Sequence, residues 1–341
     1  MFSWFKKNKN HSAWVNQHAV PVAARETLLQ AGLRAGLDMP YSCRVGGCGT
    51  CKCKLVDGKV RQLTDFSYVL SEQEMQQGYI LACQSVPLGE IRVEAVLDRP
   101  LAAAQQVGGR VLAQQRLTHD IMLLRVRLDD SLRYLAGQYV ELSVASLPGV
   151  ARNYSFATAP SHDGIAEFFV RRVPGGLFSA HINDQQLVGE AVSLRGPLGD
   201  FHLHPGTGPL LMVAGGSGLA PIRAILQDAA AQGLARPVRV LFGARRQQDL
   251  YLLDELEQLA RQWPAAFSVL PVLSEPGDDD WTGARGLITE HFGAVSADTD
   301  AYLCGPPVMV DAASDVLRQQ GIDPARIHAD RFLTQPLAAA V

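Results

Sequence analysis

Residues 43–53 read CRVGGCGTCKC, and this stretch decides how the first part of the chain folds. Cys43, Cys48 and Cys51 follow the spacing C-x4-C-x2-C, and Cys83 adds a fourth cysteine further along. Four thiolates at this plant-type spacing are typical of the ligands of a [2Fe-2S] cluster. The glycines between them permit the positive φ angles that a loop wrapped around a cluster requires. The stretch therefore predicts an iron–sulfur site held by these four cysteines.

Two other kinds of site also use four cysteines. A structural zinc site usually carries paired short knuckles, whereas here only Cys48 and Cys51 form one. A disulfide framework needs an oxidising compartment, and no segment of this sequence directs the chain there. Cys53 lies two residues beyond Cys51, and we interpret it as a packed thiol rather than a fifth ligand. The iron–sulfur site remains the favoured interpretation.

The composition describes an ordinary globular protein. A chain of 341 residues is long enough for two or three domains, and 47% of its residues are hydrophobic. The net charge of −3 gives no overall electrostatic reason to bind nucleic acid or an anionic membrane. No stretch approaches the roughly 18 apolar residues of a membrane span, and the N-terminus lacks a signal-peptide core. We expect a cytoplasmic protein, where thiols stay reduced and can ligate iron.

The first unit covers residues 1–97. Leucines at near-helical spacing predict a helix over 27–37 that ends just before the cysteine loop. After the loop, residues 52–56 are expected to form a strand, which a tight turn joins to a partner strand at 59–62. A further apolar strand is predicted at 91–96. Small strands around one helix suggest a β-grasp ferredoxin fold.

The rest of the chain changes pattern twice. Residues 98–109 show no strand pattern and end in a glycine pair, so they are predicted to form a linker. Residues 110–205 contain alternating strands separated by turns, as in an antiparallel β-barrel. Residues 206–341 alternate apolar strands with helices, which indicates a doubly wound parallel sheet. The fold class is therefore a multidomain α+β and α/β protein with three modules.

Two motifs in the barrel segment suit a flavin. The first is RNYS at 152–155. Its Arg152 can form two hydrogen bonds to a pyrophosphate, Tyr154 can stack on the flavin ring, and Ser155 can hydrogen-bond to that ring. The second is the turn GGLFS at 175–179, which precedes a predicted helix whose first backbone amides form an anion site. The candidates in this turn are Gly175, Gly176 and Ser179.

The last segment carries a glycine-rich loop, GGSGLAP at 215–221, directly after a strand and before a helix. Gly216 and Gly218 would let a dinucleotide phosphate approach the backbone closely. The loop departs from the GxGxxG fingerprint because Pro221 replaces the last glycine. Cys304 ends the fourth strand of the expected sheet, so it should face the cofactor crevice.

The segment GARRQQD at 243–249 bears on which nicotinamide dinucleotide is used. Arg245 and Arg246 would favour the 2′-phosphate of NADP, whereas Asp249 would favour the ribose hydroxyls of NAD. From these residues alone the choice stays open.

These motifs in this order resemble the reductase component of bacterial multicomponent oxygenases. In that family a plant-type ferredoxin is fused to a ferredoxin-NADP reductase-like module, and the resemblance covers the chain from about Trp14 to Phe332. The segments that carry it are PYSCRVGGCGTC, RNYSFA, GGLFS, GPLGDF, GGSGLAP and CGPPVMV. The resemblance implies a flavin-binding barrel, FAD rather than FMN because of the domain order, and NADH rather than NADPH.

The resemblance also implies roles for individual residues. Arg152, Tyr154 and Ser155 would contact the flavin, and Gly176 and Ser179 would lie near its phosphates. Gly216 and Gly218 would line the dinucleotide site. Cys304 would lie beside the reacting nicotinamide carbon, and an aromatic near the C-terminus, here Phe332, would lie against the flavin, although nine residues follow it in this chain.

The activity that the resemblance implies is electron transfer from NADH through FAD and the cluster to a terminal oxygenase. A ring-hydroxylating dioxygenase, a di-iron monooxygenase and a desaturase are all compatible acceptors. Two other functions remain open from the residues: a flavin or dye reductase with structural zinc, and a redox-sensing iron–sulfur interaction module.

Overall fold

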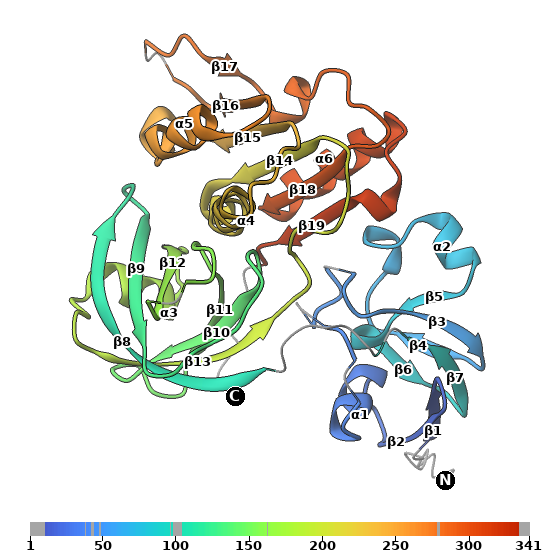
Figure 1. Ribbon diagram of the computed structural model, residues 1–341. Coiled ribbons are helices and arrows are strands. Elements are labelled where there is room, and N and C mark those ends of the chain that lie inside the picture. The colour runs from blue at the N-terminus through green and yellow to red at the C-terminus, as the bar shows by residue number, and fades with distance from the viewer. Residues whose placement is uncertain are drawn as a thin grey trace. The chain divides into compact units, whose positions relative to one another are not determined.

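The chain forms two compact units, Met1–Pro100 and Leu101–Val341, in the computed structural model (Figure 1). Each unit has a hydrophobic core of its own. No helix in the part of the chain that the structure describes is long and apolar enough to cross a membrane. The described residues are 11–37, 39–41, 44–47, 49–95, 97, 104–161, 163–277 and 280–333.

The first unit is built on a five-stranded sheet in the order β2-β1-β7-β3-β5. Strands β1 and β7 are parallel, and the other neighbours are antiparallel. Such a mixed sheet with one main helix confirms the β-grasp prediction, although β1 and β2 were not foreseen. The elements are β1 (His11–Val15), β2 (His18–Val22), α1 (Leu28–Arg34), β3 (Lys52–Asp57), β5 (Tyr79–Leu81) and β7 (Ile91–Glu94).

Helix α1 begins and ends for local reasons. Thr27 caps its first turn and Gln30 completes the capping box, while Leu28 and Leu29 are buried in the core. The helix ends at Arg34, earlier than predicted, and Gly36 then adopts φ +78°.

The predicted hairpin between residues 52–56 and 59–62 is wrong. Strand β4 (Val60–Gln62) pairs with β6 (Ser85–Pro87), not with β3. Strand β3 has β5 on one side and β7 on the other, so neither of its edges is open to β4. The unit is completed by η1 (Phe66–Tyr68), α2 (Glu72–Gln76) and η2 (Ala82–Gln84).

The second unit opens with a six-stranded antiparallel sheet in the order β11-β10-β13-β8-β9-β12. A bridge between Phe156 and Phe168 links its two ends, so the sheet closes as the predicted barrel. Helix α3 (Leu177–Asp184) packs Phe178 and Ile182 into the barrel core. The strands are β8 (Gln105–Arg116), β9 (Ile121–Leu128), β10 (Tyr139–Val144), β11 (Ala151–Ser155), β12 (Ile165–Arg171) and β13 (Ala191–Leu198).

Strand β8 begins at Gln105, inside the range 98–109 that was predicted to be linker. The segment from Gln105 to Gly109 pairs with β13, and Val107 is buried in the barrel core. The glycine pair hid this strand from the sequence pattern, because glycine has no side chain to show the alternation.

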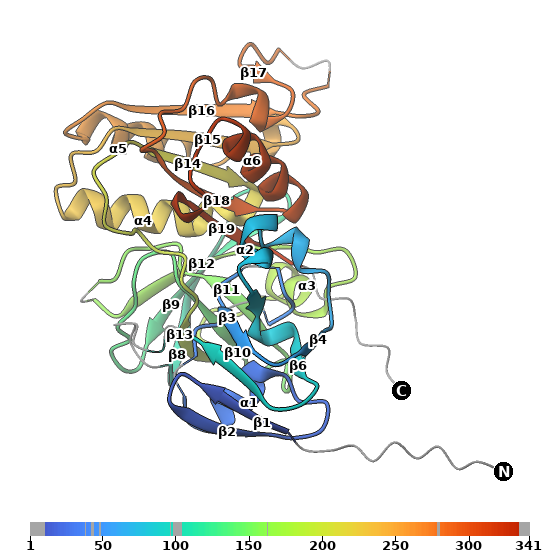
Figure 2. The same ribbon diagram turned by 90° about the vertical axis from the view of Figure 1, so that its right-hand side faces the viewer.

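The rest of the second unit is a parallel sheet in the order β17-β16-β15-β14-β18-β19. Figure 2 shows β16, β15, β14, β18 and β19 side by side in this order. Within this sheet the chain runs outward from β14 through β15 and β16 to β17, and then crosses back to β18 on the other side of β14. This order confirms the doubly wound prediction. The elements are β14 (Leu210–Gly215), α4 (Leu219–Ala231), β15 (Val238–Ala244), α5 (Leu253–Gln262), β16 (Phe267–Leu273), β17 (Ala284–Arg285), β18 (Asp300–Gly305), α6 (Pro307–Gln319) and β19 (Ile327–Arg331).

The helices cover both faces of this sheet. Met212 on β14 packs with α4 and α5, whereas its neighbour Val213 packs with α6. The strand order reverses between β14 and β18, and ligands of such sheets bind at the carboxyl ends of the strands at that point.

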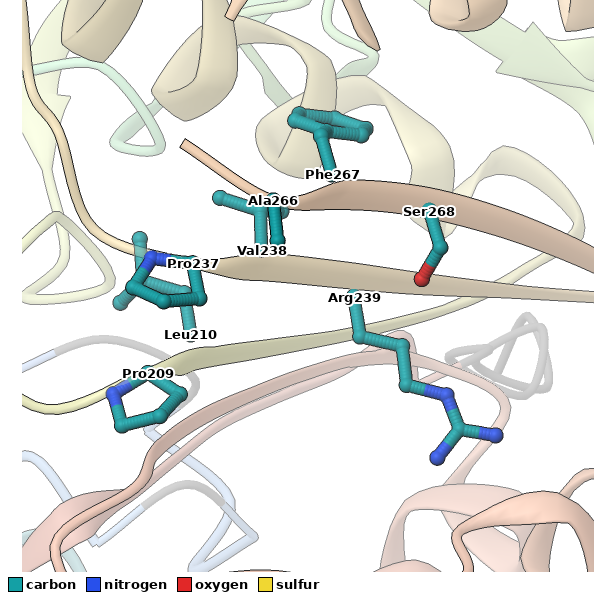
Figure 3. Close-up of a pocket in the computed structure, with 8 residues that line it drawn as sticks. All are labelled: Pro209, Leu210, Pro237, Val238, Arg239, Ala266, Phe267 and Ser268. Carbon is teal, nitrogen blue, oxygen red and sulfur yellow. The ribbon is translucent and has the colours of Figure 1, made fainter. Parts of the chain in front are cut away.

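A pocket of about 170 Å³ lies at the opposite, amino ends of β14, β15 and β16 (Figure 3). Leu210, Val238 and Phe267 contribute its apolar wall. Its location at the amino ends separates it from the expected cofactor crevice. The remaining lining residues are Pro209, Pro237, Arg239, Ala266 and Ser268.

Candidate functional site

Two of the four predicted cluster ligands meet in the first unit. Cys51 directly precedes β3, and Cys83 lies in η2, which follows β5. Because Lys52 pairs with Leu81, the register of β3 and β5 brings these cysteines together. Both are buried, and the Cys83 amide donates a hydrogen bond to the Cys51 Sγ atom at 3.4 Å. An amide aimed at a cysteine sulfur suits a thiolate that ligates iron. Cys43 and Cys48 lie outside the described residues.

The glycines of the cysteine loop also suit the predicted cluster. Gly46 and Gly49 have φ angles of +82° and +76°, which other residues rarely adopt. A Cβ atom on Gly46 would lie 2.8 Å from the Thr64 hydroxyl and from the Gln84 side chain. The loop therefore needs glycine here, for backbone conformation and for space.

Cys53 lies on β3 opposite Ile80 and is buried in the core of the first unit. Burial, with a smaller contribution from Cys83, raises the pKa of its thiol to about 12. A thiol in this environment stays protonated and packs as a small apolar group, which supports the interpretation of Cys53 as a packed thiol.

The barrel motif RNYS forms strand β11, where successive side chains point to opposite faces. Arg152 and Tyr154 therefore share one face, and Ser155 lies on the other, at the end of the strand and buried. The Tyr154 ring lies 5.7 Å from the ring of Phe178, and burial raises the pKa of its phenol. Arg152 and Tyr154 can thus reach one ligand together, and Ser155 can reach it only around the strand end.

The turn before α3 has the predicted form. Gly175 adopts φ +70°, and Gly176 is the N-cap of the helix. The Ser179 hydroxyl accepts a hydrogen bond from the Val173 amide at 3.0 Å and donates one to the Gly176 carbonyl at 3.3 Å. Ser179 therefore holds the turn, while the first amides of the helix supply the donors that suit a phosphate.

The glycine-rich loop lies at the carboxyl end of β14. Gly216 has φ +54°, and its carbonyl accepts a hydrogen bond from the Tyr251 hydroxyl at 2.9 Å. A Cβ atom on Gly218 would collide with the carbonyl group of Cys304. Gly218 is thus required by the close approach of the loop to β18. This approach brings the loop and Cys304 together at the reversal of strand order.

Cys304 and Phe332 lie at the same end of the sheet. The Phe332 amide donates to the Gly305 carbonyl at 2.9 Å, and its half-buried ring packs against the core cluster that contains Cys304. Burial raises the pKa of the Cys304 thiol well above its ordinary value, so the thiol is protonated at neutral pH. The structure therefore brings these two predicted residues into one neighbourhood.

Asp249 lies in η4 (Gln247–Asp249), after β15. Its Oδ2 atom accepts a hydrogen bond from the Arg246 amide at 2.9 Å. Its Oδ1 atom is buried, lies 3.3 Å from Nδ1 of His119, and has no hydrogen-bond partner among the described residues. The carboxylate of Asp249 is thus held by the Arg246 amide on one oxygen and lies beside the His119 ring with the other.

Sequence reasoning missed Arg171, at the end of β12. Its Nε atom donates to Oδ2 of Asp120 at 2.8 Å, and a Cβ atom on Gly216 would lie 3.1 Å from its Nη1 atom. A barrel cation thus lies beside the dinucleotide loop, where it can meet a phosphate. Burial alone would raise the pKa of Asp120, but the hydrogen bond and charge of Arg171 lower it overall. The only signal in the sequence was an arginine pair after a strand, which is common on surfaces.

Sequence reasoning also missed Arg223 on α4, which links the barrel to the sheet. Its Nη1 atom donates to the Ala157 carbonyl at 2.6 Å and to Glu167 at 2.8 Å, both in the barrel. Its Nε atom donates to Glu255 on α5 at 2.6 Å. This junction ties the barrel to α4 and α5 of the parallel-sheet module.

The family models match the three modules in turn. The 2Fe-2S iron-sulfur cluster binding domain matches residues 15–88, the oxidoreductase FAD-binding domain matches 109–203, and the oxidoreductase NAD-binding domain matches 212–315.

Relatives match the chain over most of its length. The electron transfer component of xylene/toluene monooxygenase from Pseudomonas putida is 40% identical, over 91% of this chain and 90% of its own. The toluate 1,2-dioxygenase electron transfer component from the same organism is 37% identical, over 90% and 92%. A solved structure of a cytochrome P450 reductase from Amycolatopsis superposes with a TM-score of 0.75 at 35% identity, covering 94% of this chain and 98% of its own.

The fold and the three matched domains together define an iron–sulfur flavoprotein oxidoreductase with a domain that binds a nicotinamide dinucleotide. The extent and identity of the matches show the family. The chain belongs to the electron-transfer reductase components of oxygenase systems.

Proposed function

We propose that this protein takes electrons from NADH and delivers them singly, through FAD and a [2Fe-2S] cluster, to a terminal oxygenase. The observation that carries the proposal is that iron–sulfur, FAD-binding and NAD-binding domains follow one another on one chain. A cysteine pair lies in the first unit, and Cys304 lies against the loop that contains Gly218 in the second. A flavin and a [2Fe-2S] cluster held by one protein can together accept a hydride as an electron pair and release the electrons one at a time.

The residues of the chain provide binding and orientation for this reaction. Tyr154 and Arg152 present a ring and a cation on one face of β11, which suits the flavin and its pyrophosphate. The first amides of α3 and the Arg171 guanidinium offer anion contacts for phosphates. Phe332 and the buried Cys304 lie at the carboxyl end of β18, where we propose that the nicotinamide binds, and Ser155 is proposed to contact the flavin ring from the strand end.

We propose NADH rather than NADPH as the donor. Asp249 Oδ1 has no hydrogen-bond partner among the described residues, and a carboxylate there would repel a 2′-phosphate. Arg245 and Arg246 are exposed beside it and would favour the opposite choice. Steady-state kinetics with both dinucleotides decides between them, and a higher kcat/KM with NADPH would reverse the assignment. Asp249→Asn should reduce the preference for NADH, whereas Asp254→Asn on α5 should leave it unchanged.

The proposed acceptor is an oxygenase because the relatives named above serve a monooxygenase and a dioxygenase. We place the reaction in the cytoplasm, where cluster thiols stay reduced. The test compares two acceptors in the wild type and in Cys51→Ser. Ferricyanide reduction by NADH should survive the substitution, and reduction of a one-electron protein acceptor, cytochrome c or the oxygenase, should fall sharply. Equal loss with both acceptors, in protein that retains flavin, would contradict the proposed electron path.

A further inference from the structure

The segment that connects the barrel to the parallel sheet carries an unassigned side-chain cluster. It follows β13 and reads Asp200-Phe201-His202-Leu203-His204. Phe201 is buried and Leu203 is partly buried, and both pack against the core shared by barrel and sheet. Asp200, His202 and His204 alternate with these two apolar residues along the segment.

The polar atoms of these three side chains converge. One ligand atom from each, a carboxylate oxygen and two imidazole nitrogens, lies within 4.8 Å of the others. His202 Nε2 lies 3.3 Å from Asp200 Oδ1, and both side chains are mostly buried, with exposed fractions of 17% and 19%. Two ligands of a tetrahedral zinc ion, each about 2.0–2.1 Å from the metal, lie roughly 3.3 Å apart. The separation of the Asp200–His202 pair is thus close to that of two zinc ligands.

Two further aromatic side chains continue the stack that His202 and His204 begin. His202 stacks on His204 with ring centroids 4.3 Å apart, and His204 stacks on His328 of β19 at 4.2 Å. His328 in turn stacks on Tyr302 of β18 at 4.6 Å. The His204 amide donates to the Tyr302 hydroxyl at 2.8 Å, which fixes the end of the segment to the sheet. The lone pair of an imidazole nitrogen lies in the plane of its ring, and the planes of His202 and His204 are 25° from parallel, so a shared ion requires His202, the outer ring of the stack, to turn towards it.

We propose that Asp200, His202 and His204 form a binding site for a divalent transition metal of the zinc class. Two imidazoles and one carboxylate suit Zn²⁺, Ni²⁺ or Cu²⁺, whereas Mg²⁺ and Ca²⁺ prefer oxygen ligands alone. The site lies in the covalent connection between the flavin-binding barrel and the dinucleotide-binding sheet, and it is separate from the cysteines of the first unit. A bound ion would bridge the ends of this segment and fix it against β18 and β19.

The test titrates the full-length flavoprotein with ZnCl₂ in a calorimeter, after dialysis against a chelator. The wild type should show one saturable site, and His202→Gln and His204→Gln should each weaken it about 10-fold or more, because one of three ligands is lost. His18→Gln, at an exposed position on β2, is the matched control and should leave the affinity unchanged. His328→Phe keeps a ring in the stack and should change the affinity less than 3-fold. Bound FAD per chain shows that each variant is folded.

Zinc K-edge absorption of the loaded protein gives an independent readout. We expect only nitrogen and oxygen neighbours at about 2.0–2.1 Å, and a sulfur shell near 2.3 Å would overturn the proposal. Equal zinc affinity in the wild type, His202→Gln and His204→Gln would also overturn it, as would the absence of saturable binding. A larger loss of zinc affinity in His328→Phe than in His204→Gln would refute the assignment of Asp200, His202 and His204 as the ligands.

Discussion

The backbone amide of Cys83 donates a hydrogen bond to the sulfur of Cys51 across 3.4 Å, although 32 residues separate them in the chain. The register of β3 and β5 produces this contact, so the sheet brings these two predicted cluster ligands together.

We expect the cysteines of the first unit to separate into two classes. Cys48→Ser and Cys51→Ser should each lose the iron–sulfur absorbance and keep bound flavin, because cluster ligation is local to this unit. Cys53→Ser should keep the cluster and lower the free energy of unfolding by about 1–2 kcal/mol, because a hydroxyl replaces a buried thiol. Iron content and visible spectra measure the first effect. Loss of iron in Cys53→Ser, or full iron content in Cys51→Ser, would contradict the assignment.

Gly218→Ala should disrupt the dinucleotide site. The added methyl group would meet the backbone of Cys304 and Gly305, which cannot move without shifting β18. We expect a loss of about 3 kcal/mol or more in stability and a marked rise in KM for NADH. Gly233→Ala is the control in the same module: nothing lies within 4 Å of the added atom, and its φ of +69° predicts a cost of roughly 1 kcal/mol. Equal effects in the two variants would refute the proposed role of Gly218.

Arg223→Met should weaken the junction between barrel and sheet. The substitution leaves Glu167, whose side chain is only 6% exposed, with Arg125 as its remaining ion-pair partner. We expect the free energy of unfolding of the second unit to fall by about 2–4 kcal/mol. Arg261→Met, which removes an exposed pair with Glu257 at 3.8 Å, should change it by less than about 0.5 kcal/mol. Denaturant titration of both variants, followed by flavin fluorescence, measures the difference.

The Asp120–Arg171 pair should make stability depend on pH. The folded-state pKa of Asp120 is lowered, so its contribution is present above the ordinary aspartate pKa and is lost as pH falls through the folded value. The free energy of unfolding of the wild type should exceed that of Asp120→Asn by about 1 kcal/mol from pH 7 to about pH 5. This difference should vanish in more acidic solution. Asp130→Asn, at an exposed position after β9, is the control for the same chemical change at the protein surface. A constant difference at every pH would show that Asp120 does not act through its charge.

The start of β8 predicts where the chain can be divided. A fragment from Ala104 to the C-terminus keeps the whole strand and should fold, bind FAD and reduce ferricyanide with NADH. A fragment from Arg110 lacks Gln105–Gly109, which pair with β13, and should bind FAD weakly or fail to fold. Flavin content after gel filtration distinguishes them. Similar flavin content in both would show that this part of β8 is dispensable.

The sequence predicted features that depend on short-range pattern. Cysteine spacing identified the iron–sulfur module, and alternation of strands and helices identified the parallel sheet with Cys304 at its carboxyl end. The pairing of β4 with β6 could not be predicted, because it depends on which edges of β3 are already occupied. The approach of Arg171 to Gly216 was equally hidden, since it joins the barrel to the sheet.

The separate cores of the two units have a consequence for how this protein melts. Met1–Pro100 and Leu101–Val341 each bury their own apolar residues, so one unit can lose its structure while the other keeps its own. Thermal denaturation should then show two transitions, one that bleaches the iron–sulfur colour and one that releases the flavin. A single melting temperature would describe neither of them. The effect of a substitution on heat resistance must be assigned to the transition of the unit that carries it.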